Sequence, residues 1–260
     1  MNIEDVIAIV KEASSLMMTD SFVVDEKDGC ENIVTSSDLA VQHFLLSELS
    51  ELLPGSGFLC EEEDCVTEQR EYTWIIDPID GTANYAHFLP ECSISVALAK
   101  ESEVIMAVVY CPRIGELYTA EKGKGAFLNG RPIHVSSKAF RESLICTAMS
   151  TYRKEFAQSC NDIIMDVYMQ SNDYRRFGVA SVEMCFIGAG RCDLYFEMRL
   201  MPWDYAAAGL VMTEAGGCIC NLNGEFPSLK EPDLVVGANT PENLKKLLAI
   251  VRKHVPVRPY

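Results

Sequence analysis

Apolar residues recur in the first part of the chain with the spacing of helices that have one buried face. They do so over residues 3–17 and again over residues 36–53, and this period of about 3.6 residues predicts two amphipathic helices. The Ser/Thr-rich stretch before the second pattern is typical of a helix N-cap, and Pro54 and Gly55 end that helix.

The rest of the first half contains short apolar and β-branched runs separated by turn residues. After a short run at residues 57–60, the apolar segment at residues 72–77 predicts a buried strand. Four further β-rich runs follow, at residues 92–100, 103–112, 115–123 and 125–133. Such spacing indicates an antiparallel meander, so we expect residues 1–140 to combine helices with an antiparallel sheet.

The second half alternates between strand and helix patterns. Strands are predicted at residues 143–149, 174–177, 192–198, 216–222 and 233–239, and helices at residues 155–170, at 181–189 and from Tyr205 onward. A last helix has Thr240 as its N-cap and Pro241 at its first position. This alternation favours a layered α/β sheet in residues 141–260. Because no repeat or composition break separates the halves, we expect one compact unit over residues 1–260.

The chain is strongly acidic, since 22 Lys and Arg residues stand against 38 Asp and Glu residues and give a net charge of −16. Such a field disfavours binding to nucleic acid or to an anionic membrane. A phosphorylated ligand would need a cation to mediate its binding. The hydrophobic fraction of 48% over 260 residues is sufficient for a large core.

The cysteines and the N-terminal pattern predict a cytoplasmic location. Eleven cysteines, without a CxxC pair, lie mainly in apolar segments, where reduced thiols pack as small hydrophobic groups. The first turn of the first predicted helix is acidic, whereas a secretory signal begins with basic residues. No apolar run reaches the roughly 18 residues of a membrane span.

The motif WIIDPIDGTANY places two aspartates three positions apart at the end of the apolar strand. A turn there would bring Asp77 and Asp80 toward one point, and the Ile79 carbonyl would add a third oxygen of the kind that Mg²⁺ prefers. Gly81 leaves room for a phosphate beside the backbone amides, and Thr82 offers a hydroxyl. The simpler alternative, given equal weight, is a strand-to-turn connection whose aspartates satisfy backbone amides.

Two other acidic positions are candidates for the same site. Residues 61–64 form an acidic run after a short strand, which by itself is more typical of a solvated loop. Asp204 stands before an alanine-rich helix that Gly216 and Gly217 end, so the simpler interpretation makes it an N-cap. A capping carboxylate can also bind a metal, because the cap holds it in a fixed orientation.

These motifs together resemble those of the inositol monophosphatase family of Mg²⁺-dependent, lithium-sensitive phosphatases. The resemblance rests on WIIDPIDGTANY, PWDYAAAGLVMTEAGG and YTAEKGKGAFLNG, on the VTSSD element that ends at Asp38, and on the acidic pair that begins at Glu61. It implies a mixed α/β fold: a layered αβαβα sandwich with an antiparallel N-terminal sheet and a mixed C-terminal sheet.

The resemblance also implies a set of metal ligands. Glu61, Asp77 and the Ile79 carbonyl would hold one Mg²⁺, and Asp77, Asp80 and Asp204 would hold a second. A third, weaker ion would lie near Glu61. Mn²⁺ is a possible substitute for Mg²⁺, and Li⁺ would inhibit.

The remaining implied roles concern catalysis and the substrate. Asp38 and Thr82 would orient the attacking water, with Glu61 as the third catalytic residue. Substrate contacts would come from Asp80, Gly81, Thr82, Ala180, Glu197 and Asp204. Lys27 would lie on a mobile loop that closes near the metals. Two positions depart from the family pattern, since Cys60 replaces a usual glycine and Asn32 a common aspartate.

The function that the resemblance implies is hydrolysis of inositol monophosphate by direct attack of a metal-activated water, in a homodimer. Glu197 in YFEM favours a polyol, but fructose 1,6-bisphosphate, 3′-phosphoadenosine 5′-phosphate and histidinol phosphate stay open as substrates. A regulatory binding protein with the same fold is a further alternative, and the net charge disfavours a two-metal nuclease. The four histidines, His43, His87, His134 and His254, are interpreted as structural, with His87 closest to the motif.

Overall fold

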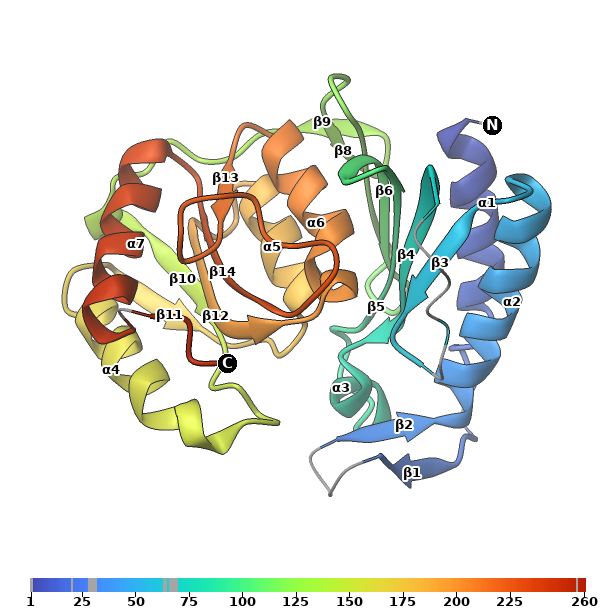
Figure 1. The fold of residues 1–260 in the computed structure, drawn as a ribbon, viewed down its shortest axis with the longest axis horizontal. Coiled ribbons are helices and arrows are strands. Elements are labelled where there is room, and N and C mark those ends of the chain that lie inside the picture. The colour runs from blue at the N-terminus through green and yellow to red at the C-terminus, as the bar shows by residue number, and fades with distance from the viewer. Residues whose placement is uncertain (1, 20, 28–31, 63–64, 66–69, 256) are drawn as a thin grey trace.

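The computed structural model describes residues 2–19, 21–27, 32–62, 65, 70–255 and 257–260. It contains two large sheets that lie side by side, each covered by helices on its outer face and sharing a helical layer between them (Figure 1). None of the helices in these ranges is both long and apolar enough to cross a membrane.

The first large sheet belongs to the N-terminal half. Its seven strands, in spatial order, are β3 (Gly57–Cys60), β4 (Tyr72–Asp80), β5 (Ser93–Lys100), β6 (Glu103–Cys111), β7 (Glu116–Glu121), β8 (Ala126–Leu128) and β9 (Arg131–Ile133). The antiparallel meander predicted from the sequence is confirmed from β4 to β9. The edge strand β3 differs, because it pairs with β4 in parallel.

The second large sheet is mixed, as expected. Its strands are β11 (Asp173–Arg175), β10 (Leu144–Thr147), β12 (Leu194–Leu200), β14 (Asp233–Ala238) and β13 (Cys218–Cys220), in that spatial order. The strand β10 is parallel to both of its neighbours, whereas β14 is antiparallel to β12 and β13. A separate hairpin of β1 (Val24–Glu26) and β2 (Ile33–Thr35), absent from the sequence prediction, precedes the second helix.

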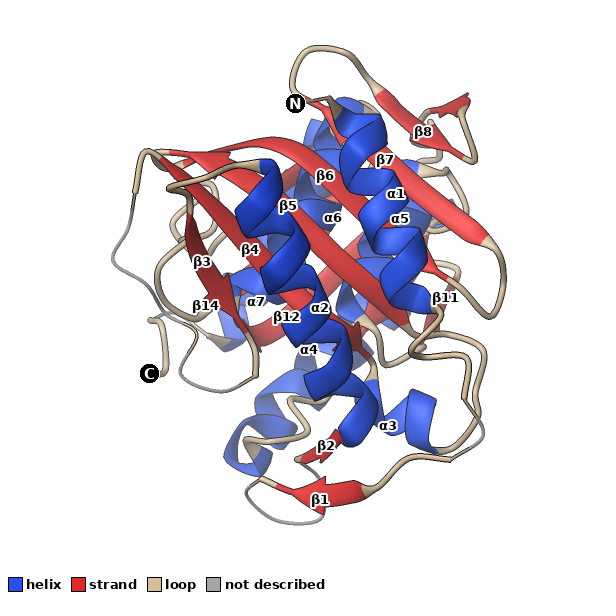
Figure 2. Cartoon of the chain, turned by 90° about the vertical axis from the view of Figure 1, so that its right-hand side faces the viewer, coloured by secondary structure: helices blue, strands red, loops and turns tan. Residues whose placement is uncertain are grey.

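The helices fill three layers around these sheets. They are α1 (Ile3–Ser14), α2 (Ser36–Leu52), α3 (Thr82–Ala86), α4 (Ala157–Tyr168), α5 (Ala180–Gly188), α6 (Pro202–Glu214) and α7 (Pro241–His254). The pair α1 and α2 covers the outer face of the first sheet (Figure 2). The pair α5 and α6 packs between the sheets, and α4 and α7 cover the second sheet. The helix, sheet, helix, sheet, helix order confirms the αβαβα prediction.

Capping residues fix where the two N-terminal helices begin. Asn2 and Asp5 form a capping box at α1, and Thr35 and Asp38 form one at α2. In each box the two side chains accept hydrogen bonds from each other's backbone amides, which satisfies donors that have no partner inside the helix. The second box matters for function, because it fixes one of the predicted catalytic residues.

The central core combines the two halves of the chain. Ile75 and Ala97 on the first sheet belong to the same buried cluster as Met184 on α5, Tyr195 on β12 and Ala207 on α6. Apolar contacts of this kind hold α5 and α6 against both sheets. The expectation of one compact unit over residues 1–260 stays a prediction, which a single unfolding transition would support.

Candidate active site

The two aspartates of the DPID motif both lie in β4, which continues through Asp80 instead of turning after Asp77. Asp77 pairs with Ser95 and Asp80 with Ser93, so three steps along β4 match two steps along β5. The extra residue forms a bulge at Pro78 and Ile79, where proline cannot donate to the ladder. The predicted turn is therefore wrong, and the bulge instead places both carboxylates at the end of the strand.

Gly81 makes the transition from β4 to the short helix α3. Its φ is +86°, in the left-handed region, and a Cβ there would lie 2.6 Å from Cγ2 of Val179. Both the backbone conformation and the close contact require glycine. Because Val179 immediately precedes α5, this contact also brings the C-terminal half of the chain against the motif.

Asp38 and Thr82 meet although they are far apart in sequence. The Thr82 hydroxyl lies 3.2 Å from Oδ1 of Asp38 and 3.1 Å from the Ile79 carbonyl oxygen. The other oxygen of Asp38 accepts hydrogen bonds from the amide and hydroxyl of Thr35. Burial raises the pKa of Asp38 to about 6, although the bonds from Thr35 oppose that shift.

Glu61 follows β3 directly, and its amide donates to the Ile76 carbonyl of β4 at 3.2 Å. Next to it, the Glu62 amide donates to the side-chain oxygen of Gln42 at 3.0 Å, and the Gln42 amide group donates back to the Glu62 carbonyl. This clamp holds the backbone of the acidic pair against α2. Glu63 and Asp64, the rest of the acidic run, lie outside the described residues.

Lys27 lies at the acidic pair. Its Nζ is 3.2 Å from Oε1 of Glu61 and contacts a Glu62 oxygen. Burial raises the pKa of Glu62 to about 7, with the charge of Glu61 adding to the effect. Residues 28–31, on the loop after Lys27, lie outside the described residues, and the mobility of that loop stays a prediction.

Asp204 is positioned by the start of α6, but not as its N-cap. The helix begins at Pro202, so Met201 is the N-cap and Asp204 is the third helical residue. Its carboxylate accepts a hydrogen bond from the Met201 amide at 2.7 Å. The prediction of an N-cap at Asp204 is therefore wrong by three positions, because the proline at the first helical position starts the helix earlier than the alanine run suggests.

The start of α5 contributes to the same place. The Ser181 amide donates to Oδ2 of Asp80 at 2.7 Å. Burial raises the pKa of Asp80 to about 6, against the hydrogen bonds from the amides of Ser181 and Ala180. The Ala180 amide, which the resemblance assigns to the substrate, is thus directed at Asp80.

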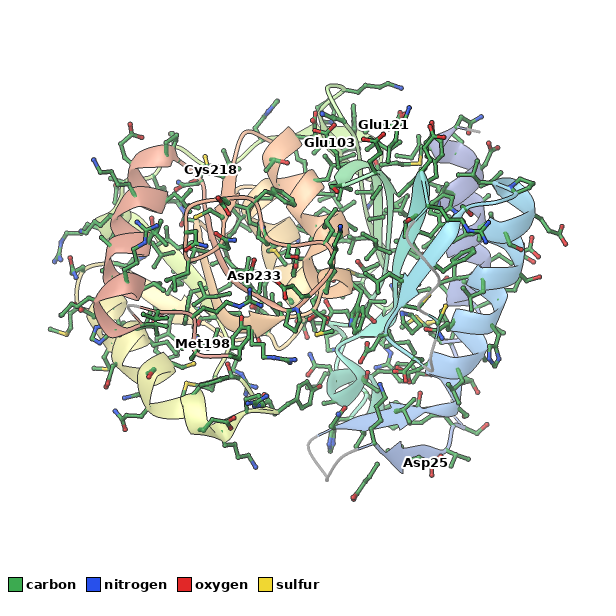
Figure 3. The ribbon with its side chains drawn as sticks, in the orientation of Figure 1. Asp25, Glu103, Glu121, Met198, Cys218 and Asp233 are labelled. Carbon is green, nitrogen blue, oxygen red and sulfur yellow. The ribbon has the colours of Figure 1, made fainter. Side chains whose placement is uncertain are left out.

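Glu197 lies on β12, the strand marked by Met198 in Figure 3. Its carboxylate accepts a hydrogen bond of 2.6 Å from the Tyr195 hydroxyl. Burial raises the pKa of Glu197 to about 7, and the Tyr195 bond opposes the shift.

A cavity of about 720 Å³ brings these side chains together. Four of its lining carboxylates, which we call the acidic cluster, are Glu61, Asp77, Asp80 and Asp204. Burial raises the pKa of Asp77 well above its usual range, and the charges of Glu61, Asp80 and Asp204 raise it further. Burial raises the pKa of Asp204 in the same way, with Asp80 and Glu61 as the next causes. The charges of Glu61, Asp80 and Asp204 therefore act on Asp77 in addition to its burial.

The other predicted site residues are distributed around this cluster. Lys27, Ile79, Gly81, Thr82, Ala180 and Glu197 also line the cavity, together with Asn32, whereas Asp38 is fully buried behind Thr82. Of the described cavity residues none is a histidine, and the structural interpretation of the four histidines stays a prediction. His254, for example, contacts Asp166 on α4 at 3.0 Å.

Three arginines that the sequence prediction missed also line the cavity: Arg153, Arg176 and Arg199, here called the arginine group. Arg153 pairs with Glu155, at 2.5 Å between Nε and Oε1. Arg176 donates to the Thr151 hydroxyl at 3.0 Å, and the Arg199 guanidinium lies over the Tyr260 ring. Within the described ranges neither Arg176 nor Arg199 forms an ion pair with a carboxylate, although the charge of Arg176 acts to lower the pKa of Glu197. No local motif identifies these residues, although Arg199 lies only two positions after Glu197 on β12.

Comparison with known proteins agrees with this arrangement. The profile of the inositol monophosphatase family matches residues 2–256. The chain therefore belongs to the inositol monophosphatase family.

Individual relatives differ in the names that they carry. The putative Nus factor SuhB of Neisseria meningitidis is 35% identical over 238 residues, which cover 91% of this chain and 90% of that protein. The fructose-1,6-bisphosphatase/inositol-1-monophosphatase of Thermotoga maritima is 35% identical over 202 residues, covering 78% and 76%. Among solved structures, the extragenic suppressor protein suhB of Bartonella henselae has a TM-score of 0.89 at 28% identity and covers 97% of this chain and 99% of its own.

Proposed function

We propose that the chain is a Mg²⁺-dependent phosphatase that hydrolyses inositol monophosphate or a closely related phosphorylated polyol. The observation that carries the proposal is the acidic cluster, where four carboxylates, from β4, from α6 and from the residue that follows β3, line one cavity. Burying four ionised carboxylates in one place raises the free energy of the folded state unless a cation compensates their charge. Membership of the inositol monophosphatase family supports the same reaction class.

The residues present fit Mg²⁺. Oδ1 of Asp77 is buried without a hydrogen-bond partner, which is an unusual cost for a carboxylate and suits an oxygen ligand. In the described ranges no three His, Cys, Asp or Glu side chains are already arranged closely enough to coordinate a metal ion by themselves. Mg²⁺ does not need one, because it keeps several waters and binds through a few carboxylates and substrate phosphate.

Two or three ions would be held by the acidic cluster and the Ile79 carbonyl, with Mn²⁺ as a possible substitute and Li⁺ as an inhibitor. When bound, Mg²⁺ offsets the negative charge of carboxylates and phosphate and makes water a better nucleophile. Lys27 competes with an ion for Glu61 and would have to release it.

Thr82 and Asp38 would orient the attacking water. If the Thr82 hydroxyl donates to Asp38, its lone pairs remain free to accept a hydrogen bond from that water. Asp38 can in turn accept a proton, because its raised pKa of about 6 lies close to neutral pH. The backbone at Gly81 and Thr82 would bind the phosphate, and no covalent phosphoenzyme is required.

The polyol end of the substrate would contact Glu197. A carboxylate accepts hydrogen bonds from hydroxyls, and Glu197 faces the cavity from the C-terminal half. The Ala180 amide would assist only if it shifts from Asp80, so we assign it a lesser role.

The test is phosphate release from inositol 1-phosphate, fructose 1,6-bisphosphate, 3′-phosphoadenosine 5′-phosphate and histidinol phosphate, with Mg²⁺ and then with added Li⁺. We expect hydrolysis of inositol 1-phosphate that requires Mg²⁺ and is inhibited by Li⁺. Hydrolysis of none of them by a folded protein would refute the proposal. It would favour a regulatory role such as the names of the SuhB relatives indicate.

A second candidate substrate class is favoured by the arginine group. Arg176 and Arg199 form no ion pair with a carboxylate in the described ranges, although Arg176 is close enough to Glu197 for its charge to lower the pKa of that group, and the chain as a whole has a large excess of acid. A sugar bisphosphate would place its second phosphate against them, with charge-assisted hydrogen bonds. Fructose 1,6-bisphosphate, part of the name of the Thermotoga maritima relative, belongs to this class.

Two further expectations belong to this proposal. We infer a homodimer, which light scattering on the purified protein would test. We also infer a cytoplasmic location, because the described cysteines are thiols and most of them are buried.

A further inference from the structure

Two cysteines flank the acidic pair at the edge of the cavity. Cys60 ends β3 and is buried, and Cys65 is partly exposed. Their sulfur atoms are 2.9 Å apart. The length of a disulfide bond is about 2.05 Å, so the two thiols are within about 1 Å of bonding distance.

We propose that Cys60 and Cys65 form a reversible oxidation site that takes a peroxide as its oxidant. The more exposed Cys65 is the thiol that a small oxidant reaches first, and the buried Cys60 lies beside it to resolve the product. Most other described cysteines are buried, so the accessible member of a close pair is unusual in this chain.

The reaction is balanced in two steps. The Cys65 sulfur attacks one oxygen of hydrogen peroxide, the O–O bond breaks, and a sulfenic acid and one water result. The Cys60 sulfur then attacks the sulfenic sulfur, the S–O bond breaks, and a second water leaves as the disulfide forms. A dithiol reductant reverses the change by exchange.

The modification matters because Glu61 and Glu62 lie between the two cysteines. A Cys60–Cys65 bond would close a ring around both glutamates, while Gln42 holds the Glu62 backbone and Lys27 holds both carboxylates. The ring would keep Glu61 on Lys27 and reduce its freedom to turn toward an ion. This consequence, unlike the bond itself, rests on the proposed phosphatase function.

The first measurement is the mass of the protein after peroxide treatment and alkylation. Reduced protein is treated with equimolar hydrogen peroxide, unfolded and alkylated, and we expect two fewer alkylated thiols than the eleven of the reduced chain. Cleavage after Glu61 and Glu62 should give two peptides joined only by the Cys60–Cys65 bond. Full alkylation, or a bond confined to other cysteines, would overturn the proposal.

The second measurement is the Mg²⁺ concentration for half-maximal phosphatase activity. We expect oxidation to raise it at least about fivefold, the lower end of typical coupling between sites, and dithiothreitol to restore it. Cys65→Ser should retain the reduced behaviour and resist peroxide. Cys218→Ser, at another partly exposed thiol, is the matched control and should stay sensitive.

The outcomes separate the two proposals. A joined pair with an unchanged Mg²⁺ requirement would overturn the coupling to Glu61. A chain that forms the bond but hydrolyses no phosphate ester would refute the proposed function, while the mass would still establish the oxidation site.

Discussion

The acidic cluster and the arginine group line one cavity but are held in different ways. Two carboxylates of the cluster are fixed by backbone amides, Asp80 by Ser181 and Asp204 by Met201. Arg176 is exposed and donates a hydrogen bond to the Thr151 hydroxyl, and Tyr152, another lining residue, is 62% exposed. For the proposed phosphatase, this contrast would place the reaction on rigid backbone and leave discrimination between substrates to side chains at the surface.

The largest expected effect comes from the acidic cluster. Asp204→Asn keeps an oxygen that can accept the Met201 amide but removes a negative charge, so activity should fall at least about 100-fold with little change in melting temperature. Steady-state kinetics and calorimetry measure both. Glu214→Gln, at the other end of α6, serves as the control and should keep activity. Unfolding of the Asp204 variant would mean that the residue is mainly a cap.

Removal of the unpaired arginines should give an intermediate effect. We expect Arg176→Gln and Arg199→Gln each to lower kcat/KM about tenfold for fructose 1,6-bisphosphate and to leave fructose 1-phosphate within about twofold. Arg175→Gln removes the neighbouring charge, which is paired with Asp173 and lies outside the cavity lining, and should change neither substrate. An equal decrease in kcat/KM for both substrates would show that the arginines do not bind the second phosphate.

The contact between Gly81 and Val179 joins the N-terminal and C-terminal halves of the chain, and its contribution to the free energy of unfolding can be measured. Gly81→Ala must adopt a positive φ and also displace Val179, so we expect a loss of roughly 2–4 kcal/mol in the free energy of unfolding. Gly55→Ala has nearly the same φ and nothing within 4 Å, and should lose only about 1–2 kcal/mol. Urea unfolding measures both. Adding Val179→Ala should recover part of the difference, and no recovery would contradict the contact.

The smallest effect concerns Glu197, the carboxylate of the second sheet. Its pKa is raised from 4.5 to about 7 on folding, so the folded state keeps a proton that the unfolded state loses between those values. Its contribution to stability is therefore present at low pH and declines as pH rises from about 4.5 to about 7. Without Mg²⁺, Glu197→Gln should weaken the fall in unfolding free energy between pH 5 and 8. The exposed Glu51→Gln should leave that fall unchanged.

The sequence was a good guide to the parts of the site that lie in one short segment. Asp77, Asp80, Gly81 and Thr82 lie within six positions, and the chain needs only one bulge to direct them into the cavity. The bulge itself was not predictable from the local pattern, because it depends on how β4 pairs with β5. The start of α6 was misplaced because alanine content was weighed above the proline at its first position.

The arginine group was beyond sequence reasoning for a different reason. Arg176 follows a three-residue edge strand and Arg199 lies in a longer strand, and neither position differs locally from an ordinary surface arginine. Only the packing of the second sheet against the α5 and α6 layer, which also contacts the first sheet, brings them to the cavity that the acidic cluster lines. The parallel pairing of β3 likewise follows from tertiary structure, since a four-residue apolar run carries no information about direction.

The hydrogen bond between Ser181 and Asp80 has a consequence for biosynthesis. It links positions that are separated by 101 residues, and Asp204 is still further along the chain. Contacts of such long range form late during folding. A nascent polypeptide on the ribosome therefore lacks Asp204 until α6 has been synthesised, and the complete set of four carboxylates can come together only after that stage.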